Sequence, residues 1–360
     1  MNFYLIGAGV IARSHAEAIR KLDNADEVTL IVADTNPQVL RDFQALYPEA
    51  ETFLDAQEML AGEAQDDDIV VICAPPFTHF SLSKMALESG RHVLCEKPLV
   101  MNEEEADELL EIARRNNRQL GCCSVRFIGL PKLDEIKRLL ETNQLGDIYK
   151  VTFIHRGQRG RPGVEYQPES KWFLDRSKSG GGIVMDWGPY DFTVINDILK
   201  PTSVEVTAAW TSKPQTEVDP VDTVYDVEGH VGAMLKYHAE GKSIWVHYER
   251  AHCTHGKPYH LVEIEGTKGA VEWSPYFESD KVIFRTDKNG EVVTEEVELA
   301  NTNAIDYMDH PIHYFYRKVK GEPSPALTNE QAIFNFKCLQ ALYKAAETGA
   351  GAVVEEVVSA

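Results

Sequence analysis

The feature that most constrains the fold is a glycine-rich turn that joins a short apolar run to a helical pattern. The run Phe3–Ile6 leads directly into Gly7-Ala8-Gly9-Val10-Ile11-Ala12, and apolar residues then recur at helical spacing. A strand, a tight turn and a helix N-terminus place free backbone N–H groups where a diphosphate can bind. Gly7 permits the turn, and Gly9 permits close approach of the phosphates. The segment predicts the first βαβ unit of a dinucleotide-binding fold.

An acidic residue follows the second predicted strand. The strand Val28–Ala33 ends at Asp34, about 20 residues after the glycine turn, where the dinucleotide fingerprint places an acid for the adenosine ribose. A carboxylate there repels a 2′-phosphate, so NAD is favoured over NADP. The alternative role for Asp34 is an N-cap of the helix that begins near Pro37. We expect Asp34 to bind the cofactor together with the helix start at Val10 and Ile11.

Two further loops follow predicted strands. The apolar run Ile69–Cys73 leads into Ala74-Pro75-Pro76-Phe77-Thr78-His79, and the strand His92–Cys95 leads into Glu96-Lys97-Pro98. Strand and helix patterns alternate up to about residue 123, which predicts a doubly wound parallel sheet. The carboxyl ends of such strands share one edge, so these loops are expected to line one ligand crevice with the glycine turn.

Lys97 is the strongest candidate for chemistry in this part of the chain. Pro98 restricts the backbone of the residue before it, so Lys97 sits on a stiffened turn. A lysine held there can direct its ammonium at a substrate oxygen. An ordinary surface turn is the alternative for Glu-Lys-Pro taken alone.

Beyond Arg126 the pattern changes to that of a second domain. Strand-like runs extend from Val204 to Val297, after a helix and a strand at Pro131–Glu141 and Ile148–His155. Hairpin signals separate the runs, at Glu228–His230, Ala239–Lys242, Glu265–Gly269 and Asp287–Gly290. They predict a mostly antiparallel sheet. Two helical patterns close the chain, near Pro311–Lys320 and Asn329–Glu347.

The fold class is therefore α/β. We predict a Rossmann domain with a doubly wound parallel sheet at residues 1–123 and an α/β domain with a large open, mostly antiparallel sheet at residues 124–360. A chain of 360 residues is longer than a single hydrophobic core usually accommodates, which agrees with two domains.

A glycine triplet introduces the second candidate group. Gly180-Gly181-Gly182 allows the backbone to approach a ligand closely, and Asp186 and Tyr190 follow it. If the segment is helical, these two residues share a face. A tyrosine hydroxyl near an ammonium is a usable proton donor and acceptor for an alcohol–ketone pair. The alternatives are a helix cap for Asp186 and a core position for Tyr190.

Composition excludes several classes of protein. A net charge of −21 disfavours nucleic acid as a partner, and no apolar run reaches the ~18 residues of a membrane span. The N-terminal apolar run has no basic region before it, which argues against a signal peptide. Six scattered cysteines are typical of reduced thiols, so we expect a cytoplasmic protein.

Two clusters outside these motifs contain residue types that bind metals or anions. Zinc is not predicted at the first, because it lacks a second recognisable ligand pair; its members are His247, His252, Cys253 and His255. The second is a basic loop in an otherwise acidic chain. A solvated or interface loop is one interpretation, and the hypothesis that the basic loop motivates is a substrate with a carboxylate or phosphate. The members of the basic loop are His155, Arg156, Arg159 and Arg161.

Together these motifs resemble the Gfo/Idh/MocA oxidoreductase family. The resemblance runs through the whole chain and rests on the glycine turn with His15, Ala74-Pro75-Pro76 with His79, Glu96-Lys97-Pro98, Arg126, and the triple glycine with Asp186 and Tyr190. It implies a nicotinamide cofactor, sugar-like or polyol substrates, and a second domain whose open sheet forms a homodimer or homotetramer interface. No metal is implied.

The resemblance also implies residue roles. Tyr190 would be the general acid/base, Lys97 would polarise the substrate oxygen and depress the tyrosine pKa, and Asp186 would orient the substrate. Many relatives have histidine in place of Tyr190, so the chain is similar to the tyrosine-containing branch. The implied cofactor contacts are Gly7, Gly9, Val10, Ile11, Asp34, Ala74, Pro75, Pro76, His79, Glu96, Lys97, Arg126 and Trp172. The implied substrate contacts are Lys97, Arg126, Arg156, Asp186 and Tyr190.

The expected activity is hydride transfer between NAD and a sugar, polyol or related hydroxyl or carbonyl compound. Two alternatives stay open at this point. One is cleavage of a glycosidic bond through transient oxidation by NAD, and the other is a nucleotide-sensing regulator without catalysis.

Overall fold

The computed structural model describes residues 1–299 and 305–355, and these form two compact units. Of the described residues, the first unit contains 1–126 and 305–336, and the second contains 127–299 and 337–355. Residues 356–360, at the end of the predicted second domain, lie outside the described residues.

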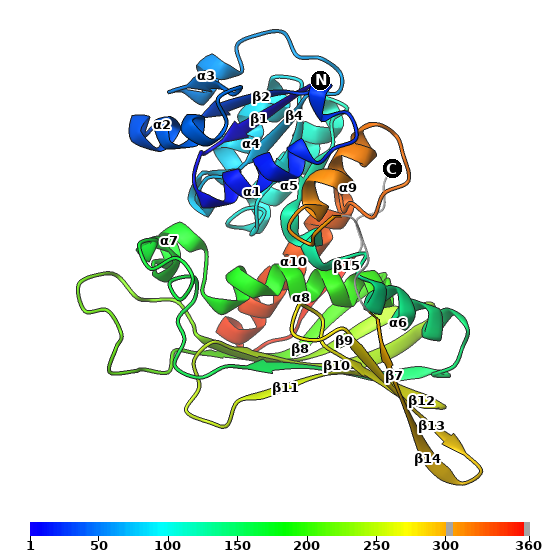
Figure 1. Ribbon diagram of the computed structural model, residues 1–360. Coiled ribbons are helices and arrows are strands. Elements are labelled where there is room, and N and C mark those ends of the chain that lie inside the picture. The colour runs from blue at the N-terminus through cyan, green and yellow to red at the C-terminus, as the bar shows by residue number, and fades with distance from the viewer. Residues whose placement is uncertain (300–304, 356–360) are drawn as a thin grey trace. The chain divides into compact units, whose positions relative to one another are not determined.

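A six-stranded parallel sheet forms the centre of the first unit, in the order β3-β2-β1-β4-β5-β6 (Figure 1). Its strands are β1 (Asn2–Ile6), β2 (Thr29–Ala33), β3 (Glu51–Phe53), β4 (Ile69–Ile72), β5 (His92–Cys95) and β6 (Leu120–Cys122). β1 pairs in parallel with both β2 and β4, so the strand order reverses there. The predicted doubly wound sheet is confirmed, and its carboxyl edge carries the loops that were expected to bind ligand.

Helices cover both faces of this sheet. They are α1 (Val10–Arg20), α2 (Pro37–Leu46), α3 (Ala56–Met59), α4 (His79–Glu88), α5 (Glu103–Arg115) and α9 (His310–Val319), with 3-10 turns η1 (Ala25–Glu27), η2 (Pro76–Thr78) and η3 (Cys123–Phe127). α1, α2 and α9 contribute to one apolar core with β1 and β2, and α4 packs against α5. The last strand of the sheet, β6, ends at Cys122, because η3 begins at Cys123.

Helix α9 joins the first unit from far along the chain. Ile312 and Phe315 lie in the same core cluster as Phe3. The ammonium of Lys21 donates to both oxygens of the buried Asp309 carboxylate, at 3.0 and 2.8 Å. The grouping of residues therefore differs from the predicted division at 1–123 and 124–360. The helical pattern was visible in the sequence, but the surface it packs on was not.

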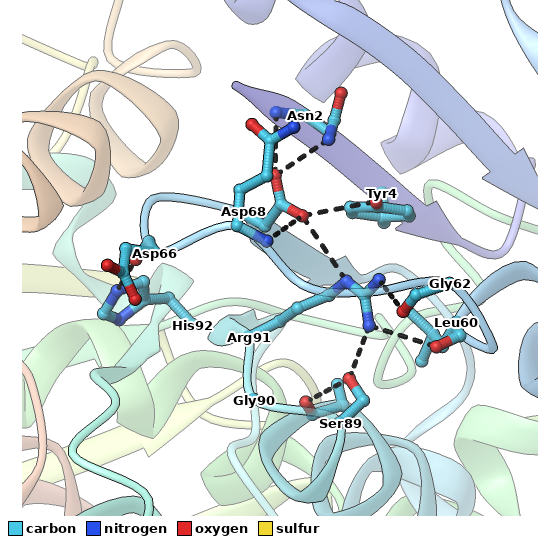
Figure 2. A network of polar contacts seen from close by, with 12 residues as sticks. Asn2, Tyr4, Leu60, Gly62, Asp66, Asp68, Ser89, Gly90, Arg91 and His92 are labelled. Carbon is cyan, nitrogen blue, oxygen red and sulfur yellow. Dashed lines mark hydrogen bonds and ion pairs between the residues drawn. The ribbon is translucent and has the colours of Figure 1, made fainter.

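A buried polar network closes the amino edge of the parallel sheet, opposite the ligand edge (Figure 2). Asp68, just before β4, accepts hydrogen bonds from the backbone N–H of Asn2 and the hydroxyl of Tyr4, at 3.1 and 3.3 Å. The Arg91 guanidinium, just before β5, lies 3.7 Å from Asp68 and stacks over the Tyr4 ring. Paired in this way, the buried charges hold the strand starts together.

A nine-stranded sheet forms the second unit, in the order β14-β13-β12-β11-β7-β10-β9-β8-β15. Its strands are β7 (Ile148–Arg156), β8 (Ser203–Ser212), β9 (His230–Ala239), β10 (Lys242–Ala251), β11 (Tyr259–Gly266), β12 (Gly269–Trp273), β13 (Lys281–Lys288), β14 (Glu291–Glu298) and β15 (Ala352–Glu355). All pairings are antiparallel except that of β7 with β10, so the predicted mostly antiparallel sheet is confirmed.

Helices lie on one side of this sheet (Figure 1). They are α6 (Pro131–Glu141), α7 (Arg176–Ser179), α8 (Ile183–Leu199) and, from Lys337 onward, α10 (Glu330–Thr348), with the 3-10 turn η4 (Lys171–Leu174). α8 contacts β9 and β10 directly. Among residues 1–299 and 305–355, no helix combines the length and apolar character that crossing a bilayer requires.

Three of the four predicted hairpins are present. β9–β10, β11–β12 and β13–β14 turn at the expected places, with Gly241 and Gly290 at positive φ as tight turns require. The fourth prediction is wrong. Glu228-Gly229-His230 does not turn a hairpin, because β8 ends at Ser212 and a long connection precedes β9. Glu228 instead has a role at α8.

Candidate active site

The glycine turn has the geometry that a bound diphosphate needs. Gly7 has φ +98°, and a Cβ there would lie 2.7 Å from the carbonyl oxygen of Cys73, so only glycine fits. Gly9 is the N-cap of α1 and has no side-chain capping bond. A Cβ on Gly9 would meet no atom within 4 Å, so packing within the chain does not require glycine at that position. Uncapped N–H groups beside open space fit a dinucleotide.

Asp34 is tied to the glycine turn. Its carboxylate accepts hydrogen bonds from the backbone N–H of Ala8 at 2.9 Å and of Asn36 at 2.8 Å. The N-cap of α2 is Asn36, whose side chain accepts from Gln38 and Val39. The capping alternative for Asp34 is therefore wrong, and the carboxylate lies at the carboxyl end of β2 beside the turn.

His79 holds two of the predicted cofactor loops together. Its ring is buried, with Nδ1 2.7 Å from the carbonyl oxygen of Pro98 and Nε2 2.8 Å from that of Ala74. Burial lowers the pKa of His79, although both carbonyl contacts favour the charged ring. The side chain thus fixes the Ala74–Pro76 turn against the Lys97 turn. We propose that His79 acts on the cofactor through these turns.

Glu96 is the centre of a buried ionic network. Its Oε1 accepts from Nε2 of His15 at 2.9 Å and from the Arg126 guanidinium at 2.7 Å. Its Oε2 accepts from the backbone N–H of Lys97 at 3.1 Å. Burial alone would raise the pKa of Glu96, but the charge of Arg126, the hydrogen bond from His15 and the charge of Lys97 lower it well below its usual value.

The same network includes Cys123, whose Sγ lies 3.9 Å from Nε2 of His15. His15, Glu96 and Cys123 are the one group among the described residues with the spacing of a metal site. However, Arg126 occupies the oxygen that Glu96 would offer, and burial raises the pKa of the Cys123 thiol well above its usual range. The arrangement fits an ion-pair network better than a metal centre.

Asp186 and Tyr190 lie on helix α8, as predicted, and both side chains are buried. The Asp186 carboxylate accepts from the hydroxyl of Tyr166 at 2.6 Å and from the backbone N–H of Gly163 at 3.2 Å. These partners belong to the loop after β7, so Asp186 does not cap its own helix. The Tyr190 ring packs edge-on against Trp187 and Phe127, with centroids 5.7 and 5.1 Å away.

The glycine triplet serves packing inside the chain. A Cβ on Gly182 would lie 1.9 Å from the carbonyl oxygen of Glu228, and one on Gly181 would lie 2.0 Å from the Tyr343 hydroxyl. The Glu228 carboxylate accepts from the backbone N–H groups of Gly182 and Val184, at 2.9 to 3.1 Å. Packing inside the protein therefore explains the glycines at 181 and 182, and the approach of the triplet to a ligand stays a prediction. A side chain of the protein already occupies the N-terminus of α8.

A second buried ion pair joins α8 to β10 at Asp191, the residue after Tyr190. Asp191 accepts from Nε of Arg250 at 2.9 Å, from the hydroxyl of Tyr248 at 2.7 Å and from that of Tyr276. Burial raises the pKa of both tyrosines well above the usual value, so they stay protonated donors. Sequence reasoning missed Asp191, Arg250 and Glu228. The one feature of the sequence that could have pointed to Asp191 was its position directly after Tyr190.

The sheet register places Arg156 on the face of β7 that points away from α8. Arg250, which reaches α8, pairs with His155 on β7, so Arg156 projects from the opposite face. There it lies 3.6 Å from Glu249 and stacks over Tyr259. His155 faces α8, and burial, followed by the charge of Arg250, lowers its pKa to about 2. The strand therefore presents a neutral imidazole on the α8 side.

Trp172 lies on η4 in the second unit, where it stacks on Phe173 with centroids 3.8 Å apart. Phe173 in turn covers Gly163, whose N–H bonds Asp186. The predicted contact between Trp172 and the cofactor stays a proposal.

Comparison with known proteins identifies the family. Residues 1–123 match the description "Oxidoreductase family, NAD-binding Rossmann fold", and residues 133–272 match the "GFO/IDH/MocA C-terminal domain". The chain belongs to the Gfo/Idh/MocA oxidoreductase family. The N-terminal match covers the parallel sheet with its glycine turn, and the C-terminal match covers Asp186, Tyr190 and much of the second sheet.

Several Gfo/Idh/MocA members are similar over nearly the whole chain. The D-glucoside 3-dehydrogenase of Escherichia coli (strain K12) is 27% identical over 359 residues, covering 96% of this chain and 95% of the relative. The D-xylose 1-dehydrogenase [NADP(+)] of Haloarcula marismortui is 25% identical over 97% of this chain and 91% of the relative. The solved structure of a levoglucosan dehydrogenase with NADH and levoglucosan has a TM-score of 0.78 at 20% identity, covering 98% and 99%, which shows a shared fold.

Gfo/Idh/MocA membership makes this chain an oxidoreductase with an NAD-binding Rossmann fold. When bound, the nicotinamide supplies a hydride acceptor or donor. We propose that the dinucleotide is held by the glycine turn, Asp34 and the Ala74–Pro76 turn, since each lies at the carboxyl edge of the parallel sheet.

Proposed function

We propose that the chain is an NAD-dependent dehydrogenase that oxidises a hydroxyl group of a sugar or polyol. Tyr190 takes the hydroxyl proton, Lys97 holds its charge against the same oxygen, and Asp186 orients the substrate. Asp34 selects NAD over NADP. The relatives whose names specify a D-glucoside, D-xylose or levoglucosan support a carbohydrate substrate.

The observation that carries this proposal is the setting of Lys97. Lys97 follows β5 at the ligand edge of the sheet. Its backbone N–H donates a hydrogen bond to the Glu96 carboxylate, which also accepts hydrogen bonds from His15 and Arg126. A lysine on a surface turn would not require a buried network of this kind. Lys97 itself is only partly exposed. This setting favours a fixed ammonium next to the nicotinamide site.

An uncharged substrate fits the second unit better than an anionic one. Arg156 lies on the far face of the sheet beside Glu249, and the Arg161 guanidinium donates to Glu165 at 2.9 Å. His155, on the face toward α8, is neutral. The proposed substrate contacts are therefore Lys97, Asp186 and Tyr190, without an arginine from the basic loop.

The test begins with a panel of aldoses, polyols, glucosides and sugar acids, followed by NADH absorbance. With the best substrate, Lys97→Ala and Tyr190→Phe should each lower kcat by about 10²-fold or more while the Kd for NAD changes less than about threefold. Lys84→Ala, at a partly exposed position on α4, and Tyr149→Phe, at an exposed position on β7, are the matched controls and should behave as wild type. Wild-type turnover by Lys97→Ala would exclude the role given to Lys97.

A glycoside as substrate separates the proposal from its alternative. The D-glucoside-oxidising relative makes glycoside cleavage the second candidate. Stoichiometric NADH with an intact glycoside supports the dehydrogenase. Release of free glucose with only catalytic NAD supports cleavage.

A further inference from the structure

His15 connects the start of the dinucleotide-binding helix with the turn that carries Lys97. It lies on α1, which begins at Val10 directly after the glycine turn, and its side chain is 0% exposed. Its Nε2 lies 2.9 Å from Oε1 of Glu96, which follows β5. One side chain thus joins two of the loops at the ligand edge of the sheet.

The contact with Glu96 reaches the backbone of Lys97. The two carboxylate oxygens divide their partners, because Oε1 accepts from His15 and Arg126 while Oε2 accepts from the N–H of Lys97. Arg126 is itself tied to α9, since Nδ1 of His310 donates to its carbonyl oxygen at 3.0 Å. A carboxylate anchored from three sides fixes where the peptide before Lys97 lies.

His15 is costly as a packing residue. In the described part of the chain its Nδ1 is buried and has no hydrogen-bond partner. A buried nitrogen without a partner lowers stability, so an apolar residue would fill this position better if only packing counted. The hydrogen bond to Glu96 is the property that histidine provides and an apolar residue does not.

We propose that His15 is a positioning residue for Lys97, and that it acts through Glu96. It holds the carboxylate that hydrogen-bonds the Lys97 backbone, and so aligns the ammonium with the nicotinamide site. This inference rests on the proposed role of Lys97. It assigns His15 no contact with substrate or cofactor.

The experiment compares three histidine variants with the substrate identified above. His15→Ala should lower kcat at least tenfold while the Kd for NAD stays within threefold, because misplacing a catalytic group by about 1 Å affects turnover more than binding. His15→Gln, whose terminal amide can donate to Glu96 from a similar position, should recover most of kcat.

His92→Ala is the matched control. His92 is also buried and lies at the opposite end of β5, where its Nε2 donates to the carbonyl oxygen of Asp66 (Figure 2). Its Nδ1 accepts from the backbone N–H of Gln119. This variant should lower Tm as His15→Ala does, yet keep kcat within twofold. Equal losses of kcat in both alanine variants would show a merely structural role and overturn the inference.

Glu96→Gln supplies a second readout if His15→Ala does not fold. The charge of Lys97 lowers the pKa of Glu96, and by reciprocity removal of the carboxylate charge makes the ammonium easier to deprotonate. The high-pH limb of kcat should therefore move to lower pH in Glu96→Gln, and it should stay in place in His92→Ala. An unmoved limb with wild-type kcat would overturn the inference.

The outcomes also separate this inference from the proposed function. Wild-type kcat in His15→Ala, with Lys97→Ala inactive, would refute the positioning role and leave the function of Lys97 intact. Wild-type kcat in Lys97→Ala would refute the function itself.

Discussion

At the scale of single residues, the most informative side chains are the carboxylates of Asp34 and Glu96, because their hydrogen-bond partners come from several loops. The Asp34 carboxylate accepts hydrogen bonds from N–H groups of the glycine turn and of the loop after β2. The Glu96 carboxylate accepts hydrogen bonds from His15, Arg126 and the Lys97 backbone. Each joins segments that are far apart in sequence. These carboxylates therefore fix the loops at the ligand edge before any ligand binds.

Cofactor preference is the prediction that belongs to Asp34. Asp34→Asn keeps an oxygen that can accept from Ala8 but removes the charge that repels a 2′-phosphate. We expect the ratio of kcat/KM for NADP to that for NAD to rise at least about tenfold, the equivalent of about 1.4 kcal/mol. Steady-state kinetics with both cofactors measures the ratio. An unchanged ratio would show that Asp34 does not face the ribose.

Residues at strand ends could be predicted from the sequence, and residues that act across the fold could not. Gly7, Asp34 and Lys97 follow apolar runs, so the parallel sheet brings them to one edge as expected. Glu228 and Arg250 lie far from α8 in sequence, and only the sheet register shows that they reach it. The face that Arg156 occupies was not predictable for a related reason, because a step of one residue along a strand changes the face.

At the scale of elements, the N-terminus of α8 controls where Asp186 and Tyr190 lie. The Glu228 carboxylate accepts hydrogen bonds from the backbone N–H groups of Gly182 and Val184, and from the Tyr343 hydroxyl at 2.8 Å. A negative charge at this end of a helix is favourable, but its burial is costly. Burial raises the pKa of Glu228 even though these hydrogen bonds lower it.

The raised pKa predicts a pH-dependent stability. Because Glu228 ionises at higher pH in the folded state than in the unfolded state, its favourable contribution is complete below the unfolded pKa of about 4.3 and is lost as pH rises through the folded pKa. The free energy of unfolding of wild type minus that of Glu228→Gln should therefore fall as pH rises above about 4.3. Urea unfolding across pH 4 to 8 tests this, and a constant difference would contradict the raised pKa.

At the scale of the whole molecule, each unit follows from its own sequence pattern. Strand–helix alternation predicted the parallel sheet, and glycine-containing turns predicted most of the antiparallel one. The place of α9 was not predictable, because an amphipathic pattern shows that a helix buries a face but not which core receives it. Its residues Ile312 and Phe315 complete the core of the first unit.

The open face of the second sheet predicts self-association. Trp210, Met234 and Trp245 are 47%, 38% and 45% exposed on the strands β8, β9 and β10, on the side away from α8. Large apolar side chains gathered on one face are typical of an interface. Light scattering should give a dimer or tetramer, and Trp245→Glu should lower the mass while NAD binding is kept. A monomeric wild-type protein would contradict this.

The central claim is that Lys97 and Tyr190 act on one substrate oxygen. A crystal structure of the protein with NADH and the best substrate of the panel tests this most directly. We predict that Nζ of Lys97 and Oη of Tyr190 both lie about 3 Å from the same hydroxyl oxygen. A bound substrate whose reacting oxygen meets only one of the two groups, or neither, would contradict the account.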